Sequence, residues 1–314
     1  MSEVIPFVSQ LELKEEQEWI EVLSRQLPKE RIVGFSALTA ADKKDAKIAI
    51  VANPNPDEIS QLPNLVWIHS VWAGVERLVG ELGDQPFGIV RLIDPELART
   101  MAEAVLAWSL YLHRDMPAYA RQQKNRQWKE IPYRSVSNRT VGILGLGELG
   151  TAAAQLLAGI GFKVIGWSRS QKQVDNVITK SGEDGLAETV SRSDILVSLL
   201  PLTDQTRGLI DKSVFDNLPD QAGLINFGRG PVVAIEDLVR ALDQGRLSHA
   251  VLDVFEQEPL PTESALWDHD AITVLPHISA PTNMKTASEI VARNIVLYRQ
   301  KGILPVTVSR KLGY

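Results

Sequence analysis

The sequence predicts an α/β protein that contains two doubly wound parallel sheets. Three observations support this fold class. Short apolar runs of strand length alternate with amphipathic helical segments along nearly the whole chain. A glycine turn of the form GxGxxG stands between one such strand and the helix that follows it. With 314 residues, the chain is long enough for two domains that each bury a hydrophobic core.

The composition is that of an ordinary globular protein. Hydrophobic residues make up 44% of the chain and charged residues 23%, and the formal net charge is -6. This acidic balance disfavours a nucleic-acid partner. The chain has no cysteine, which excludes disulfides and thiolate metal sites and allows a reducing compartment. We therefore expect a cytoplasmic protein with no membrane partner, because no apolar run reaches the roughly 18 residues of a membrane span and no signal-peptide pattern opens the chain.

The first segment predicts a small parallel sheet with helices between its strands. We expect a helix over 15–27, where Trp19, Ile20, Leu23 and Leu27 form one apolar stripe. A short helix should end near residue 62, and another should run from a turn at 73–75 to residue 79. The strands should lie at 4–8, 31–35, 47–52, 65–69 and 86–93.

A long helix is predicted over 96–116, because its apolar residues recur at helical spacing after the start signal Asp94-Pro95. The basic residues after it, which surround Trp128, are interpreted as a solvated helix face. Residues 132–138 then form a linker.

The second segment predicts about six parallel strands, at 140–144, 162–167, 194–200, 223–227, 249–254 and 271–275. Helices are expected at 148–157, 185–191, 213–217 and 235–244, and Gly159 and Gly161 are candidate stops for the first of these. A last helix at 284–298 and a tail should return to the first domain. The expected domains are residues 1–98 with 285–314, and residues 99–284.

The glycine turn predicts a dinucleotide site. Gly145 permits the tight turn, Gly147 allows a pyrophosphate to approach the backbone, and Gly150 allows close packing of helix and strand. The positive end of the following helix would face the phosphates. Because the motif stands in a strand–helix–strand frame, a plain structural turn is the weaker interpretation.

The tip of the next strand indicates which dinucleotide binds. An NAD-binding protein usually carries Asp or Glu there, but this chain has Ser168, Arg169 and Ser170. A guanidinium suits the 2′-phosphate of NADP. We therefore predict NADPH over NADH; the alternative is that Arg169 is only a solvated loop charge.

Three further strand ends carry reactive side chains. Arg229 follows the strand at 223–227, Glu256 and Glu258 follow that at 249–254, and His277 follows that at 271–275. Ligands of open parallel sheets bind at these carboxyl ends. Arginine binds carboxylates with two hydrogen bonds, and a carboxylate beside histidine orients the ring and favours its protonated form. The pattern predicts a site for a small charged substrate.

The motifs VGILGLGELG, LLPLTDQTRGLI, LINFGRG, AVLDVFEQEPLP and LPHISAPT resemble, in order and spacing, those of the D-isomer-specific 2-hydroxyacid dehydrogenases. The branch of glyoxylate/hydroxypyruvate reductases of type A is the most similar one. The resemblance covers nearly the whole chain and is tightest from about Glu96 to Pro281. It implies two Rossmann-like domains, the first of them flavodoxin-like, with cofactor and substrate in the cleft between them. It also implies a homodimer formed through the nucleotide-binding domain.

The resemblance assigns roles residue by residue. Arg229 would bind the substrate, His277 would be the general acid of reduction, and Glu258 would be its partner. Substrate contacts would come from Trp72, Ala73, Gly74, Val75, Arg229 and His277. Cofactor contacts would come from Gly145, Leu146, Gly147, Glu148, Leu149, Gly150, Ser168, Arg169, Ser170, Leu200, Pro201, Thr206, Phe227, Gly228, Arg229, Asp253, His277, Ser279 and Ala280. Gly228 departs from the family, where alanine or serine is commoner, and we expect this to alter packing and not chemistry.

The implied reaction is NADPH-dependent reduction of glyoxylate or hydroxypyruvate. Two alternatives remain: a dehydrogenase for a bulkier or phosphoglycerate-type 2-oxo acid, and a non-catalytic nucleotide-sensing protein. The intact set of Arg229, Glu258 and His277 argues against the latter. His69 could face the substrate loop, whereas His113, His249 and His269 are interpreted as structural or surface groups. No metal site is expected, because the chain has neither cysteine nor an HExxH motif.

Overall fold

The computed structural model describes residues 3–82, 85–310 and 313. The chain divides into two compact units, Met1–Glu96 with Thr282–Tyr314, and Leu97–Pro281. Each unit has one parallel sheet, as the sequence predicts. Among the described residues, no helix is long and apolar enough to cross a membrane.

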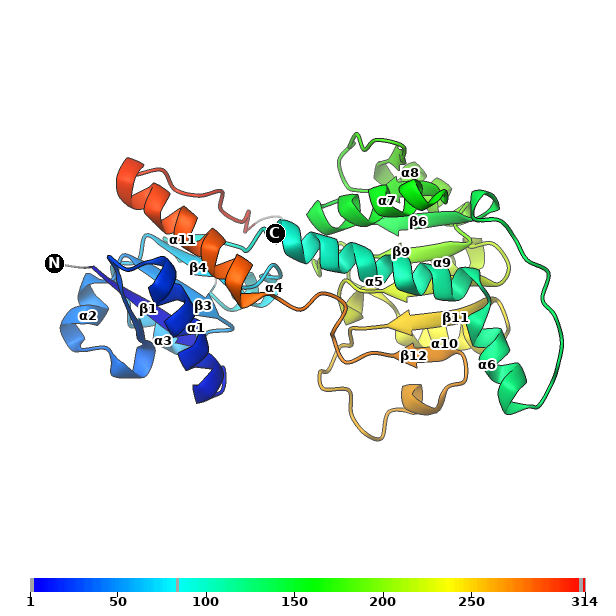
Figure 1. Cartoon of the computed structure of the whole chain (residues 1–314), viewed down its shortest axis with the longest axis horizontal. Helices are drawn as coiled ribbons and strands as arrows, with labels where there is room; N and C mark the ends of the chain where they lie inside the picture. The colour runs from blue at the N-terminus through cyan, green and yellow to red at the C-terminus, as the bar shows by residue number, and fades with distance from the viewer. Residues whose placement is uncertain (1–2, 83–84, 311–312, 314) are drawn as a thin grey trace. The chain divides into compact units, whose positions relative to one another are not determined.

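Unit 1 has a five-stranded parallel sheet in the order β2-β1-β3-β4-β5 (Figure 1). Its helices cover both faces, because alternate strand residues are apolar on each side. Helices α1 and α11 pack on one face, around Trp19 and Ile295, and α3 and α4 pack on the other, around Ile59 and Leu78. The elements are β1 (Val4–Ser9), α1 (Leu13–Gln26), β2 (Arg31–Gly34), α2 (Ala40–Asp45), β3 (Ile48–Ala52), α3 (Pro56–Ser60), β4 (Trp67–Ser70), α4 (Glu76–Glu81), β5 (Gly88–Val90) and α11 (Met284–Lys301).

The tail after α11 returns to the first sheet, as expected. The N–H of Val308 donates to the carbonyl of Ile89 in β5 at 2.7 Å. The guanidinium of Arg310 donates to the carbonyl of Phe87 at 2.8 Å. Although this tail lies more than 200 residues after β5 in the sequence, it belongs to the first unit.

Unit 2 has a seven-stranded parallel sheet in the order β12-β11-β10-β9-β6-β7-β8. Helices α5 and α7 cover one face, and α8, α9 and α10 cover the other. The elements are α5 (Pro95–His113), which begins at the unit boundary, α6 (Met116–Lys124), β6 (Thr140–Leu144), α7 (Glu148–Ile160), β7 (Lys163–Trp167), β8 (Ile178–Lys180), α8 (Gly182–Ser191), β9 (Ile195–Ser198), α9 (Lys212–Asn217), β10 (Ala222–Asn226), α10 (Ile235–Asp243), β11 (Leu247–Leu252) and β12 (Ile272–Val274).

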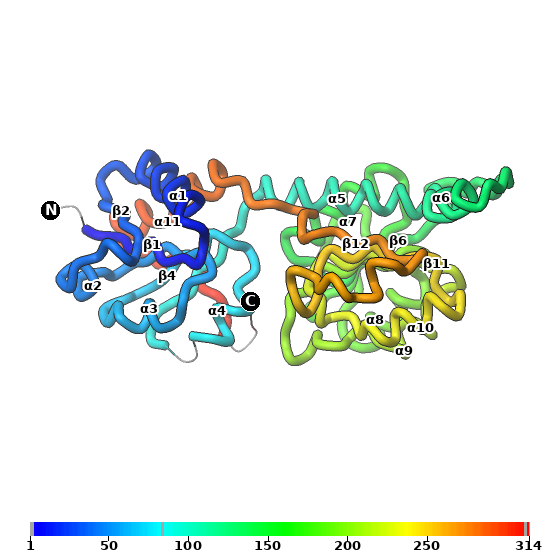
Figure 2. Tube along the Cα trace, turned by 90° about the horizontal axis from the view of Figure 1, so that it is seen from below, coloured from blue at the N-terminus to red at the C-terminus, as the bar shows by residue number. Residues whose placement is uncertain are grey.

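The helix predicted over 96–116 is confirmed as α5, but it ends at His113, three residues earlier than predicted. The chain leaves the helical path at Asp115, which adopts a left-handed conformation with φ of 55°, and α6 starts at Met116. Pro117 explains the break, because it has no N–H to continue the hydrogen-bond pattern of α5. Figure 2 shows α6 at the far end of α5, and Figure 1 shows the following segment running along the edge of the unit to β6.

Two smaller predictions also need correction. Gly159 lies inside α7, and only Gly161 ends the helix, because it alone adopts the left-handed conformation, with φ of 106°. The sheet has one strand more than the six predicted. The extra strand β8 is a short, partly exposed edge strand that lacks an apolar run, so periodicity could not reveal it.

His69 is a fully buried, polar constituent of the first unit. In β4 its Nδ1 lies 2.8 Å from the carbonyl oxygen of Ser70, and its Nε2 accepts from the side-chain amide of Asn294 at 2.9 Å. Burial lowers the pKa of His69 to about 4, although the bond to Ser70 opposes the shift. His69 is therefore neutral in the folded protein and faces the core.

This burial predicts a pH-dependent stability. The unfolded chain takes up a proton at His69 near pH 6.5, whereas the folded chain resists until about pH 4, so stability is complete above pH 6.5 and is lost as the pH falls towards 4. The ceiling for this one group is about 3 kcal/mol. Urea unfolding at pH 7.5 and 4.5 should show that His69→Gln loses less stability on acidification than the wild type. Equal losses in both proteins would contradict the assignment.

Candidate active site

The glycine turn of unit 2 has the geometry of a dinucleotide-binding loop. Gly145 has φ of 103°, and a Cβ there would lie 2.9 Å from the carbonyl oxygen of Leu199. A Cβ on Gly150 would lie 1.8 Å from the carbonyl oxygen of Gly145, so only glycine lets α7 start this close to the strand. By contrast, a Cβ on Gly147 would meet nothing within 4 Å. The turn is therefore closed towards the sheet and open at Gly147, where α7 begins, which suits a pyrophosphate.

The residues around this turn that are predicted to contact the cofactor differ in which of their atoms a ligand can reach. Glu148 is exposed, whereas the side chains of Leu146 and Leu149 pack into the core. The core position of Leu146 is tight, since a Cβ on Gly166 would lie 2.6 Å from its side chain. Only the backbone of Leu146 is therefore available to a ligand.

Arg169 lies beside this turn. The last residue of β7, Trp167, pairs with Leu144 and accepts a hydrogen bond from the N–H of Gly145 at 2.8 Å. Arg169 follows two residues later and is exposed. The hydroxyl of Ser168 donates to the carbonyl of Ser170 at 2.8 Å, which holds this loop in a tight bend. The structure thus brings together the glycine turn and the cationic strand tip, as a 2′-phosphate would require.

The loop after β9, from Leu200 to Thr206, forms the next part of the carboxyl edge of the sheet. Thr206 donates to the carbonyl of Pro201 at 2.7 Å and accepts from the N–H of Thr203 at 2.8 Å, so the loop from Leu200 to Thr206 is internally braced. Phe227, at the end of β10, is buried and donates its N–H to the carbonyl of Ser198 at 3.0 Å.

Arg229 follows β10 and is half-buried. Its Nη1 donates to the carbonyl of Gly228 at 2.7 Å. A Cβ on Gly228 would lie 2.6 Å from the carbonyl oxygen of Leu200. The loop after β9 therefore packs directly on the α-carbon of Gly228. This contact explains glycine at a position where, by the resemblance, alanine or serine is commoner.

His277 and Glu258 form a hydrogen-bonded pair. Nδ1 of His277 lies 2.7 Å from Oε2 of Glu258, while Oε1 accepts from the N–H of Phe255 at 2.9 Å. The side chains are 52% and 36% exposed, so both can reach solvent or a ligand. Because Glu258 occupies Nδ1, Nε2 is the ring nitrogen that a ligand could contact.

Asp253 holds the loop that carries His277. Its buried carboxylate accepts from the backbone N–H groups of Ile278 and Ser279, at 2.8 and 2.9 Å. His277 has φ of 54°, a left-handed conformation that is unfavourable for histidine. The two bonds to Asp253 fix the chain directly after this strained residue. The sequence analysis named Asp253 only as a cofactor contact and missed this structural role.

Ser279 and Ala280 complete the predicted cofactor residues. The Oγ atoms of Ser279 and Ser198 are buried and, within the described part of the chain, have no hydrogen-bond partner. Both follow or end strands at the carboxyl edge of the sheet. Unsatisfied buried hydroxyls at this edge fit a site that a polar ligand completes.

The substrate loop predicted in unit 1 follows β4. Trp72 packs edge-on against Trp19, with ring centroids 6.0 Å apart, and its carbonyl accepts from the N–H of Leu92. Val75 is buried, whereas Ala73 and Gly74 are half-buried. No described residue accepts a hydrogen bond from the backbone N–H groups of this Ala73–Val75 turn. The loop therefore has donors available for an anion.

The remaining histidines do not join the pair at Glu258. His249 is buried, and burial lowers its pKa to about 4, with the charge of Arg121 adding to the shift. His113 is also buried, which lowers its pKa. His269 lies 3.3 Å from Asp243 and accepts from the N–H of Ala271. His113, His249 and His269 are structural or surface groups, as expected.

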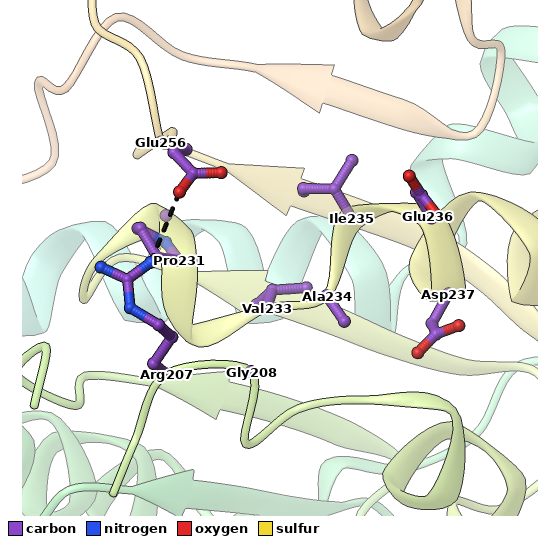
Figure 3. A pocket seen from close by; sticks show the side chains of 10 residues that line it. Arg207, Gly208, Pro231, Val233, Ala234, Ile235, Glu236, Asp237 and Glu256 are labelled. Atoms are coloured by element: carbon purple, nitrogen blue, oxygen red, sulfur yellow. Dashed lines mark hydrogen bonds and ion pairs between the residues drawn. The ribbon is translucent and has the colours of Figure 1, made fainter. Parts of the chain in front are cut away.

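Unit 2 also has a surface cavity of about 490 Å³ at the start of α10 (Figure 3). An ion pair of 3.4 Å between Arg207 and Glu256 crosses it. Gly230, next to Arg229, contributes to its wall, but Arg229, Glu258 and His277 do not line it. Of the sequence candidates, only Glu256 lies here, away from the His277 pair.

Comparison with known proteins agrees with the geometry. Residues 106–279 match the family described as "D-isomer specific 2-hydroxyacid dehydrogenase, NAD binding domain". A glyoxylate/hydroxypyruvate reductase A of Photorhabdus laumondii is 35% identical over 303 residues, which cover 95% of this chain and 96% of that protein.

Two crystal structures are similar over the full length of both chains. A D-isomer-specific 2-hydroxyacid dehydrogenase from Xanthobacter autotrophicus, in complex with NADPH and MES, superposes with a TM-score of 0.93 at 35% identity. An NADPH-dependent glyoxylate/hydroxypyruvate reductase from Sinorhizobium meliloti, in complex with NADP and sulfate, superposes with a TM-score of 0.90 at 32% identity. With its fold, its glycine turn and its family match taken together, this chain belongs to the D-isomer-specific 2-hydroxyacid dehydrogenases.

Proposed function

We propose that this protein reduces glyoxylate or hydroxypyruvate to the 2-hydroxy acid with NADPH. The contact that carries the proposal is the 2.7 Å hydrogen bond between His277 and Glu258 at the carboxyl edge of the second sheet. An imidazole held in this way by a carboxylate is the arrangement of a general acid. The relatives that bear the name glyoxylate/hydroxypyruvate reductase support the choice of substrate.

In this reaction NADPH supplies the hydride. Arg229 binds the substrate carboxylate through its guanidinium. Within unit 1, the backbone N–H groups of the Ala73–Val75 loop are donors suited to an anion. His277 donates its proton from Nε2 to the carbonyl oxygen as C2 is reduced. Glu258 holds the ring through Nδ1 and fixes its orientation.

The preference for NADPH is supported by the strand tip. Ser168, Arg169 and Ser170 stand where an NAD-binding protein has a carboxylate, and Arg169 is exposed next to the glycine turn. A guanidinium pairs well with a 2′-phosphate and has no comparable partner on NADH. NADP in the related crystal structures agrees with this assignment.

A homodimer and a cytoplasmic location are part of the same proposal. The segment from α6 to β6 exposes aromatic side chains, with Trp128 99% and Tyr133 67% exposed. Large apolar groups with this much exposed area are typical of a surface that a partner covers, and we assign this surface to a second copy of the chain. The absence of cysteine is compatible with a reducing cytoplasm.

Cofactor choice can be tested with Arg169→Asp. Removing the guanidinium and adding a negative charge should weaken NADPH binding by about 10- to 100-fold and NADH binding much less. Fluorescence titration with each cofactor gives the two affinities. Arg192→Asp, an exposed arginine at the opposite edge of the same sheet, is the control and should change neither. Equal losses for NADPH and NADH would refute the role of Arg169.

The general acid can be tested with His277→Gln. Turnover of glyoxylate should fall by about 10²- to 10⁴-fold, because proton donation is lost, while the affinity for NADPH changes little. NADPH consumption at saturating cofactor measures turnover. His269→Gln removes a different histidine that also contacts a carboxylate, Asp243, and should keep wild-type activity. Near-normal turnover in His277→Gln would rule out the mechanism.

The dimer can be tested with Trp128→Ser. If a second copy covers this side chain, the substitution should weaken association by about 10-fold or more, as loss of a buried tryptophan anchor does. Sedimentation velocity over a range of concentrations measures this. Trp267→Ser replaces another exposed tryptophan of unit 2, at 50% exposure, and should leave association unchanged. A wild-type protein that stays monomeric would overturn the proposal.

A further inference from the structure

The turn that carries Arg229 is closed by the side chain of Asn226, the last residue of β10. Asn226 is only 1% exposed. Its Oδ1 accepts from the N–H of Gly228 at 3.3 Å, and its Nδ2 donates to the carbonyl oxygen of Arg229 at 3.1 Å. One amide therefore binds the turn at both ends. The partners also fix the orientation of the amide, because a backbone N–H can only donate and a carbonyl can only accept.

Asn226 itself is anchored in the rigid centre of the sheet. β10 lies between β9 and β11, and both neighbours run parallel to it. The carbonyl of Asn226 accepts from the N–H of Asp253 at 3.1 Å, and the N–H of Phe227 donates to the carbonyl of Ser198 at 3.0 Å. The two hydrogen bonds of the Asn226 side-chain amide, called the amide clasp below, thus tie the turn that carries Arg229 to backbone that has little freedom to move.

The turn cannot shift towards β9 either. A Cβ on Gly228 would lie 2.6 Å from the carbonyl oxygen and 2.9 Å from the nitrogen of Leu200. The carbonyl of this same glycine accepts from Nη1 of Arg229 at 2.7 Å. The direction of the guanidinium therefore depends on the orientation of the Gly228–Arg229 peptide, which lies between the two backbone groups that Asn226 binds.

We propose that Asn226 is a positioning residue for Arg229, and this inference rests on the proposed role of Arg229 in binding the substrate carboxylate. The clasp needs one acceptor and one donor in a planar group of this size. Asparagine supplies both, whereas aspartate keeps only the acceptor and alanine supplies neither. Loss of the clasp should allow the Gly228 peptide to rotate and should misalign the guanidinium.

The first test is the kinetics of Asn226→Ala. The KM for glyoxylate should rise by about tenfold or more, since small misplacements of a binding group are costly, whereas the affinity for NADPH should stay within about twofold. Asn226→Asp keeps the acceptor alone and should show a similar rise, so it serves if the alanine variant folds poorly. A fall in melting temperature with an unchanged KM would overturn the proposal.

Asn217→Ala is the matched control. Asn217 lies in the same unit and donates to the carbonyl of Ser213 at 2.8 Å, but it is exposed and this bond stays within its own helix, α9. This variant should keep the wild-type KM. A KM raised as much as in Asn226→Ala would mean that any lost side-chain bond in this unit has the effect, and would overturn the specific role of Asn226.

A double-mutant cycle tests whether Asn226 acts through Arg229 or only stabilises the unit in general. Arg229→Lys should raise the KM by itself, and adding Asn226→Ala to it should raise the KM little further, because the group that Asn226 positions is already lost. If the two substitutions instead raised the KM by independent factors that multiply, this result would contradict a role of Asn226 through Arg229.

A crystal structure of Asn226→Ala tests the inference without any assay. The expected result is a rotated Gly228 peptide and loss of the Arg229–Gly228 hydrogen bond, and an unchanged turn would overturn the proposal. If the wild-type protein consumes no NADPH with any 2-oxo acid, the proposed function fails, whereas this structural result still decides whether Asn226 positions Arg229.

Discussion

The backbone of Leu199 and Leu200 is packed between two glycines, and this contact organises the carboxyl edge of the second sheet. On one side, a Cβ on Gly145 would lie 2.9 Å from the carbonyl oxygen of Leu199. On the other, a Cβ on Gly228 would lie 2.6 Å from that of Leu200. The arrangement follows from strand order, because β9 lies between β6 and β10. The dinucleotide turn and the arginine turn are therefore held at a fixed spacing by the same short segment.

A second constraint acts at the outer strands. His277 adopts a left-handed backbone conformation, which costs of the order of 1 kcal/mol or more for a residue with a side chain. Two hydrogen bonds to the buried carboxylate of Asp253 hold the next two residues. Glu258 is fixed in turn by the N–H of Phe255. The geometry of the His277–Glu258 pair is thus set in advance by backbone groups, and a substrate does not need to organise it.

The histidines show how environment divides one residue type between two roles. His69 and His249 are buried, have pKa values lowered to about 4, and are neutral polar groups of the two cores. His277 is half exposed and bonded to a carboxylate. Of these three, only His277 combines access to solvent with a carboxylate partner, and the proposed proton donation depends on that combination.

Much of the fold and of the candidate site could be predicted because it depends on local pattern. Apolar runs with a period of two, amphipathic helices and the GxGxxG turn determined nearly all the strands and helices, and Arg229, Glu258 and His277 could be assigned to strand ends from their place in the chain. The edge strand β8 and the short helix α2 were missed, because neither has an apolar run, and the break before α6 was missed although Pro117 marks it. Tertiary structure alone decided the contacts that join distant segments: the Asn226 clasp, the bonds from Asp253 to the His277 loop and the close approach of Gly228 to Leu200. A sequence pattern records which face of an element is buried, whereas these contacts depend on strand order and on distances of a few tenths of an ångström, which exist only after the sheet has assembled.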